Sequence, residues 1–162
     1  IPIIKAIRCD NGTEFINSVV KDWWKSKGID FQSTAPHNPQ SNGSAERLNS
    51  VLRQKSTAML VAANLEQEFW HLAVTCANWQ VNYIRNRYPH SSTTDNQPPY
   101  AMFRRIKPSL SHIRIFGCAC YPILNLELRQ KFKSAVIKGV FVGYEPDSGF
   151  YKVYFPDTGK VK

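Results

Sequence analysis

The sequence predicts a mixed α/β chain in two parts, an α/β core segment followed by a small β-rich module. Three observations predict this fold class. A short apolar strand, an amphipathic helix and a second short strand follow one another within residues 3–33. Two longer stretches with helical periodicity come next. From residue 113 onward, runs of β-branched and aromatic residues alternate with turn-forming residues.

The N-terminal elements predict a βαβ-type unit. Residues 3–9 form an apolar run that ends at Asp10, and residues 29–33 form a second short strand. Gly28 is placed to end the helix between these strands. The helix is predicted by apolar residues at helical spacing, namely Phe15, Val19, Val20, Trp23 and Trp24.

Two helices are predicted after a loop over residues 34–44, which is rich in Pro, Asn, Gly and Ser. The first covers 45–63, and its inward side chains are Leu48, Val51, Leu52, Met59 and Leu60. Asn64 and Gln67 predict a capping box that opens the second helix, which is expected to end near Tyr88. The apolar stripe of that second helix comprises Phe69, Trp70, Ala73, Val74, Ala77, Val81 and Ile84.

The C-terminal third of the sequence predicts a connector and then a small β barrel. Residues 90–112 are rich in Pro, Ser and Thr, which is typical of a linker. Two Pro-Asp-x-Gly stretches, at 146–149 and 156–159, predict hairpin turns between short strands. The predicted domains are therefore 1–89, a linker over 90–112, and a β module over 113–162.

The composition of the 162 residues is that of a globular protein, with 43% apolar and 20% charged residues, which excludes disordered, collagen-like and coiled-coil classes. No run of about 18 apolar residues is present, so no membrane span and no membrane partner are expected. The net charge of +9 favours a nucleic-acid partner, although it also suits solubility alone. The four cysteines fit no zinc pattern and are expected to be reduced thiols that pack in the core.

Asp10 and Glu46 are the candidate catalytic and metal-binding pair. Asp10 follows a predicted strand, Glu46 opens a predicted helix, and 35 residues separate them. Chance supplies such pairs in most proteins. The context is more informative, because a loop with Pro, Asn and Gly precedes the helix that opens with Ala-Glu-Arg-Leu-Asn.

Residues 9–15 (Cys-Asp-Asn-Gly-Thr-Glu-Phe) and 37–49 (His-Asn-Pro-Gln-Ser-Asn-Gly-Ser-Ala-Glu-Arg-Leu-Asn) resemble the second half of a retroviral-type integrase core. Later motifs resemble the copia-type (Pseudoviridae) branch of LTR retrotransposon Pol polyproteins. These are Phe-Trp at 69–70, Pro-Pro-Tyr at 98–100, Lys-Pro-Ser-Leu-Ser-His at 107–112, Ile-Phe-Gly-Cys at 115–118 and Gly-Val-Phe-Val-Gly-Tyr at 139–144. The resemblance covers essentially the whole chain.

This resemblance implies a ribonuclease-H-like core, of which the chain holds the C-terminal half with two following helices, and then a small SH3-like β barrel. It also implies an Asp, Asp, Glu triad that binds Mg²⁺ or Mn²⁺, with Asp10 as the second acid and Glu46 as the third. Two such ions about 3.5–4 Å apart would serve 3′-end processing and strand transfer. Carboxylate oxygens are suitable ligands for these hard cations.

The departure from the family pattern lies upstream of Asp10. Only nine residues precede it, whereas the family's first Asp and a zinc module lie further upstream. We therefore expect a fragment, cut at both ends, that has only two of the three carboxylates and does not catalyse strand transfer alone. Whether the chain is an enzyme stays open at this point.

Five residues are candidates for DNA contact by this resemblance and by position: Gln40, Asn42, Gly43, Asn49 and Arg53. The first three lie in the loop before Glu46, where amides can bond phosphates and glycine allows movement, although such a stretch also makes an ordinary surface turn. Asn49 and Arg53 share the helix face of Glu46, a face that could also be simply solvated. Two basic clusters, Arg104/Arg105/Lys107 and Arg129/Lys131/Lys133, suit either phosphate contacts or solubility.

The predicted function is therefore that of a retrotransposon integrase fragment that binds DNA and, in the full-length protein, takes part in DNA integration. The expected partners are the element ends and target DNA, with a homo-oligomer when full length. The expected place of action is the nucleus, with a cytoplasmic virus-like particle before integration. The alternative is a non-catalytic DNA-binding or protein-interaction remnant of a decayed or host-adopted element.

Overall fold

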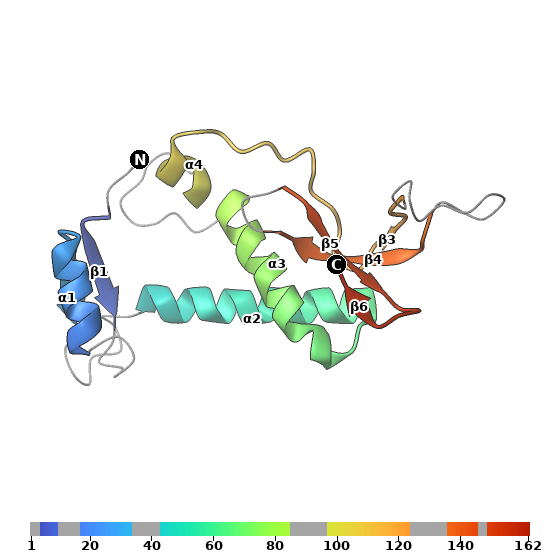
Figure 1. Ribbon diagram of the computed structural model, residues 1–162, viewed down its shortest axis with the longest axis horizontal. Helices are drawn as coiled ribbons and strands as arrows, with labels where there is room; N and C mark the ends of the chain where they lie inside the picture. Colours follow the sequence, from blue (N-terminus) through green and yellow to red (C-terminus); the bar gives the residue numbers. More distant parts are fainter. Residues whose placement is uncertain (1–3, 10–16, 34–42, 85–96, 124–135, 146–148) are drawn as a thin grey trace. The chain divides into compact units, whose positions relative to one another are not determined.

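The computed structural model describes residues 4–9, 17–33, 43–84, 97–123, 136–145 and 149–162 (Figure 1). The chain divides into two compact units, Ile1–Val51 and Leu52–Lys162, which are described separately below. Within the described residues, no helix has the length and apolar character that crossing a membrane requires. The mixture of helices and strands confirms the predicted α/β class.

The first unit contains the predicted βαβ arrangement. Strand β1 (Ala6–Cys9) pairs in parallel with β2 (Asp30–Ser33), and helix α1 (Ser18–Ser26) connects them. The Trp24 side chain is buried, and its ring stacks on that of Phe31 with 5.1 Å between centroids. Burial of this aromatic pair holds the helix on the strands.

Helix α1 has a side-chain cap at its start and the predicted glycine at its end. The Asn17 Oδ1 atom accepts a hydrogen bond from the Val20 N–H at 2.9 Å, which satisfies one of the free donors of the first turn. At the other end Gly28 adopts φ +67°, and the Ile29 N–H bonds to the Trp24 carbonyl. Gly28 therefore ends the helix, as predicted, because glycine adopts the left-handed conformation without a Cβ clash.

Helix α2 (Gly43–Ala63) continues from the first unit into the second and ends at Asn64, which adopts φ +49°. The Leu65 N–H bonds to the Leu60 carbonyl and the Asn64 N–H to the Val61 carbonyl, which is the pattern of a Schellman motif. The predicted capping box at Asn64 is therefore wrong. Asn64 closes α2, and no side-chain cap opens the short helix η2 (Gln67–Phe69) that precedes α3 (Trp70–Tyr83).

The second unit contains a four-stranded antiparallel sheet in the order β3-β4-β5-β6. Its strands are β3 (Ala119–Cys120), β4 (Gly139–Tyr144), β5 (Tyr151–Phe155) and β6 (Lys160–Val161). A tight turn joins β5 to β6, with the Gly159 N–H bonded to the Phe155 carbonyl at 2.9 Å, as the Pro-Asp-x-Gly stretch predicts. This sheet is consistent with the SH3-like module.

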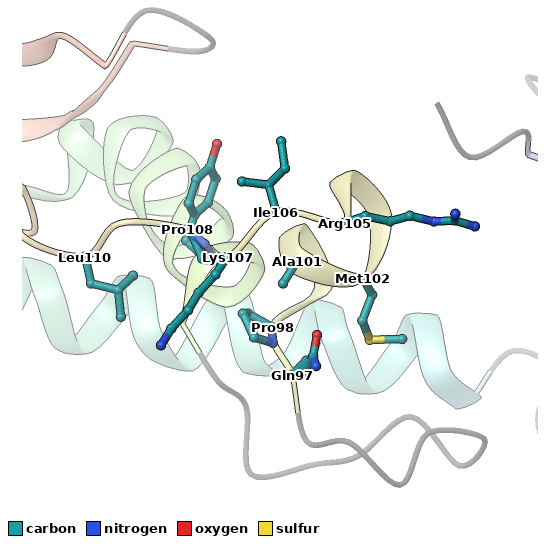
Figure 2. A pocket seen from close by; sticks show the side chains of 10 residues that line it. Gln97, Pro98, Ala101, Met102, Arg105, Ile106, Lys107, Pro108 and Leu110 are labelled. Atoms are coloured by element: carbon teal, nitrogen blue, oxygen red, sulfur yellow. The ribbon is translucent and has the colours of Figure 1, made fainter.

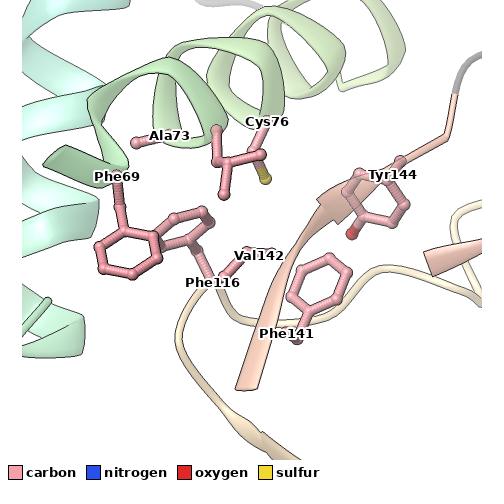
Figure 3. Packing of buried hydrophobic residues seen from close by; sticks show 8 residues of the cluster. Phe69, Ala73, Cys76, Phe116, Phe141, Val142 and Tyr144 are labelled. Carbon is pink, nitrogen blue, oxygen red and sulfur yellow. The ribbon is translucent and has the colours of Figure 1, made fainter. Parts of the chain in front are cut away.

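The core of the second unit lies where α3 packs on β4 (Figure 3). Ala73 and Cys76 of α3 are fully buried against Phe141 and Val142 of β4, and Phe116 closes the cluster. Two side chains predicted to face inward do not do so: Trp70 is 59% exposed and Leu48 is 41% exposed. Trp70 is the first residue of α3 and directly follows η2. The 3-10 turn has fewer residues per turn than an α-helix, so Trp70 does not lie on the apolar stripe that α-helical spacing predicted.

A short helix that the sequence did not predict lies inside the expected linker. Helix α4 (Pro99–Arg104) begins with Pro at its first position, where proline's fixed φ and missing N–H are both acceptable. The Tyr100 ring stacks on Tyr83 of α3 with 4.3 Å between centroids. Stacking continues from Tyr83 to Trp79 and from Trp79 to Tyr144 of β4.

The predicted domain ranges 1–89, 90–112 and 113–162 stay a prediction.

Candidate metal and nucleic-acid site

The predicted site lies on the first two turns of α2. Glu46 is in the first turn, and Ala45, Glu46, Arg47 and Leu48 are all strong helix formers. A carboxylate in this position interacts favourably with the partial positive charge of the helix N-terminus. Every residue from 43 to 49 is exposed, so the side chains of these turns are open to a ligand.

Helical geometry places three of the predicted residues on one face of α2. Asn49 and Arg53 follow Glu46 by three and seven positions, and all three are exposed. At about 100° and 1.5 Å per residue, Arg53 lies within about 20° of Glu46 around the helix axis and about 10 Å along it. This spacing places a carboxylate and a guanidinium group along one exposed face of the helix.

A shallow hollow of about 600 Å³ extends this face along α2. Arg53 and Thr57 both line it, together with Gln54 and Val61. The Thr57 hydroxyl donates to the Arg53 carbonyl at 3.0 Å, so its oxygen retains an acceptor position toward solvent. Ala58, Val61 and Ala62 supply the rest of the lining, so this part of α2 presents apolar side chains beside Arg53 and Thr57.

Glu46 has the exposure and the donor type that a metal ligand requires. Its carboxylate is exposed, and no ion pair engages it in the described part of the chain. Carboxylate oxygen is the donor type that Mg²⁺ and Mn²⁺ prefer. No cluster of three or more Asp, Glu, His or Cys residues occurs among the described residues. Of the two predicted ligands, the structure describes Glu46.

Of the four remaining candidate site residues, the structure describes Gly43. Asp10, Gln40 and Asn42 lie outside the described residues. Gly43 is the first residue of α2, and a Cβ added there would meet nothing within 4 Å. Glycine is therefore not required by packing at position 43.

The cysteines show no sign of metal chemistry where the structure describes them. Burial in the α3–β4 core raises the pKa of the Cys76 thiol to about 11. Burial also raises the pKa of Cys120, and the neighbouring Cys118 adds to that shift. Cys76 is fully buried in this core, which agrees with a packing role for that thiol, whereas Cys9, Cys118 and Cys120 are half-buried.

One feature that the sequence analysis missed is a pocket beside α4. It is lined by residues between Gln97 and Leu110 together with Tyr83, and it shares no residue with the predicted site. The sequence feature that could have indicated this pocket is the mixture of apolar and basic residues over 102–110, in a stretch interpreted as a linker.

Comparison with known proteins adds two family matches. Residues 27–99 match the integrase core domain, and residues 118–162 match the retroviral polymerase SH3-like domain. The first match includes all of α2, and the second includes the sheet β3-β4-β5-β6.

Similar proteins include the retrovirus-related Pol polyprotein from transposon TNT 1-94 of Nicotiana tabacum, 33% identical over 98% of this chain and 12% of the polyprotein. The corresponding polyprotein from transposon RE2 of Arabidopsis thaliana is 28% identical over 98% of this chain and 10% of its own length. The chain thus spans about a tenth of these relatives. The catalytic core domain of BIV integrase aligns with a TM-score of 0.44 and 24% identity, over 62% of this chain and 60% of that one.

Proposed function

We propose, because this chain belongs to the retroviral-type integrase family, that it is the part of a copia-type integrase that contacts DNA and supplies Asp10 and Glu46 for DNA integration. The observation that carries this proposal is the integrase-core match over 27–99, in which α2 presents Glu46 as an exposed carboxylate in its first turn. The longer protein would perform 3′-end processing and strand transfer.

An integrase core works with divalent metal ions, and we assign Asp10 and Glu46 as ligands for Mg²⁺ or Mn²⁺. When bound, a pair of such ions activates the attacking oxygen and stabilises the leaving oxygen. Glu46 would hold its carboxylate at the edge of the DNA face, on a rigid helix that fixes its direction.

The described strands support the assignment of Asp10. Cys9 and Ser33 are paired at the carboxyl ends of the parallel strands β1 and β2. Cys9 directly precedes Asp10, and Ser33 precedes the segment that leads to α2 and Glu46. Ligand sites in α/β proteins lie at the carboxyl ends of such strands. The two acids therefore follow chain segments that start from one edge of the sheet.

DNA contact is assigned to Gln40, Asn42 and Gly43 before the helix, and to Asn49 and Arg53 on its face. The guanidinium of Arg53 can bind a phosphate with two parallel hydrogen bonds, which gives both charge and orientation. The Asn49 amide can donate to a phosphate or a base edge nearer to Glu46. These contacts would hold the DNA while the carboxylates hold the metal.

The test uses the integrase that contains this chain, in a Mg²⁺-dependent strand-transfer assay with element-end DNA. Glu46→Gln keeps the shape but removes the charged ligand, and we expect it to lower the rate at least about a hundredfold, because the transition-state charge loses its metal support. Duplex binding in the absence of metal should stay within about twofold. The matched control is Glu66→Gln, which removes an exposed carboxylate after the end of α2.

A second readout tests the ligand assignment without activity. Mn²⁺ titrated into the isotope-labelled chain should broaden the NMR resonances of Glu46 and its neighbours in wild type and not in Glu46→Gln. Unchanged strand transfer in Glu46→Gln, with duplex binding retained, would refute the catalytic assignment. That result would favour the non-catalytic DNA-binding remnant.

The place of action and the assembly follow from the same proposal. Insertion into host DNA requires the nucleus, preceded by a cytoplasmic virus-like particle in which the DNA copy is made. Two element ends must meet one target, so we propose that the full-length protein works as a homo-oligomer. Fluorescence microscopy of the tagged protein and mass determination of its DNA complex test these two points.

A further inference from the structure

A pocket of about 750 Å³ lies beside α4 within the Leu52–Lys162 unit (Figure 2). Its floor is apolar and comes from two elements and the segment after them. Tyr83 of α3, Met102 of α4, and Ile106 and Leu110 beyond α4 contribute the larger side chains. This volume is that of a site for a few side chains of a ligand.

The apolar floor is open to solvent. Met102, Ile106 and Leu110 are 39%, 64% and 45% exposed, and they lie within nine residues of sequence. Large apolar side chains gathered at a concave surface mark an interaction site more often than single exposed ones do. No described segment covers them.

The pocket is built on a fixed base. Tyr100 of α4 stacks on Tyr83, and Ala101, which lines the pocket, is buried. The Ala101 and Met102 N–H groups bond to the Pro98 carbonyl, which fixes the first turn of α4. At the end of α4, Arg105 adopts φ +57°, a conformation that costs a non-glycine residue about 1 kcal/mol. The turn brings Ile106 and Lys107 back to the pocket.

The charge around the pocket has one sign. Arg105 and Lys107 line it, and their side chains extend to opposite sides in Figure 2. Between Asp95 and Glu127 the sequence has no acidic residue, while it has four Lys and Arg residues. A ligand here meets an apolar floor between two cations, and among the described residues that line the pocket there is no carboxylate to repel an acidic group.

We infer that this pocket binds a short peptide segment of a partner protein in which acidic residues flank apolar ones. The apolar floor favours a peptide over nucleic acid, because phosphates gain nothing from Met102, Ile106 and Leu110, whereas leucine or phenylalanine side chains would bury against them. The two cations suit carboxylates on either side of such an anchor. The pocket lining includes none of the residues assigned to the metal and DNA contacts, and its Arg105 and Lys107 belong to a basic cluster that the sequence left open between phosphate contacts and solubility.

The probe is a fluorescein-labelled peptide of three Glu-Leu-Asp-Phe repeats, measured by fluorescence anisotropy against the 162-residue chain. Its matched control is three Gln-Leu-Asn-Phe repeats, which keep the apolar residues and lose the charge. We expect the acidic peptide to bind at least about tenfold more tightly at low salt, with the difference shrinking as salt screens the two cations.

Matched variants separate the floor from the cations. Ile106→Ser should raise the peptide Kd about fivefold, whereas Ile115→Ser, at an exposed isoleucine outside the pocket, should leave it unchanged. Lys107→Glu should raise the Kd about fivefold, and Arg104→Glu, the same charge change on α4 away from the pocket lining, by less than twofold.

NMR mapping on the unmodified chain keeps the test independent of how the variants fold. The acidic peptide should shift the methyl resonances of Ala101 and Met102 and leave those at Ile115 in place. Equal affinity for the two peptides, equal effects of Ile106→Ser and Ile115→Ser, or shifts elsewhere would each overturn the inference. Displacement of the peptide by short duplex DNA, with the same dependence on Ile106, would identify nucleic acid as the occupant instead.

Discussion

Gly117 has no room for a side chain. It adopts φ +82°, and its N–H bonds to the Phe141 carbonyl at 2.8 Å, next to the end of α2. A Cβ at this position would collide with the Ala63 Cβ and lie 2.9 Å from the Ala63 Cα. The close approach lets the segment before β3 pass directly over α2, so the core depends on the missing side chain.

We predict that Gly117→Ala lowers the free energy of unfolding by about 3 kcal/mol, because it adds an overpacking term to the cost of a positive φ. The control is Gly159→Ala, where φ is +66° and a Cβ would meet nothing within 4 Å. That change should cost about 1 kcal/mol. Urea unfolding of both variants gives the difference, and equal losses would show that Ala63 moves aside freely.

Because the Cys76 thiol is buried, we predict that the free energy of unfolding depends on pH in alkaline solution. Its pKa is raised from 9.0 to about 11 by burial, so above pH 9 the unfolded chain loses a proton that the folded chain keeps. The stabilisation is complete below pH 9 and is lost as the pH rises toward 11, an effect on the order of 2 kcal/mol. Denaturant unfolding at a series of pH values should show a steeper decline in wild type than in Cys76→Ala. Parallel declines would contradict the burial of this thiol.

At the scale of single elements, the end of α2 is decided by one residue in the left-handed region. Asn64 tolerates φ +49° because its short polar side chain fits there better than an apolar one. The sequence analysis assigned this residue to the start of the next helix. Asparagine is common both at the start of a helix and just after its end, so the residue type could not decide between these roles. The backbone hydrogen bonds of Leu65 and Asn64 show that Asn64 ends α2.

We predict that Asn64→Ala destabilises the chain by about 1 kcal/mol, whereas Asn64→Gly is neutral or stabilising by a few tenths. Asn64→Ser distinguishes this role from that of an N-cap, because Ser caps a helix about as well as Asn but adopts the left-handed conformation less readily. We therefore expect Asn64→Ser to lower the midpoint of thermal unfolding, while Asn64→Gly retains it. An Asn64→Ser variant as stable as wild type would restore the capping-box interpretation.

On the scale of the whole molecule, the net charge of +9 predicts salt-dependent binding of duplex DNA. Arg53→Ala should weaken binding and reduce the slope of log K against log salt by about one, because one phosphate contact is lost. Lys25→Ala in α1 removes the same charge at an exposed position away from the assigned contacts and should leave the slope unchanged. Anisotropy titrations across a salt series measure both. Equal effects would mean that only overall charge matters.

The sequence alone predicted most of the local elements and the resemblance to an integrase core. Helical spacing, Gly28 and the Pro-Asp-x-Gly turns act over a few residues, so they predicted α1, α2 and the β5–β6 turn correctly. The motif around Glu46 predicted the integrase core that the family match bears out.

Only the tertiary structure decided how distant segments meet. Trp70 is exposed while Cys76 is fully buried, although both lie in an apolar helix, because burial depends on where β4 contacts α3. Helix α4 and its pocket exist because Tyr100 stacks on Tyr83, a contact across seventeen residues that no local pattern encodes. The spacing of apolar residues shows which face of a helix is apolar, whereas long-range packing determines which element covers that face.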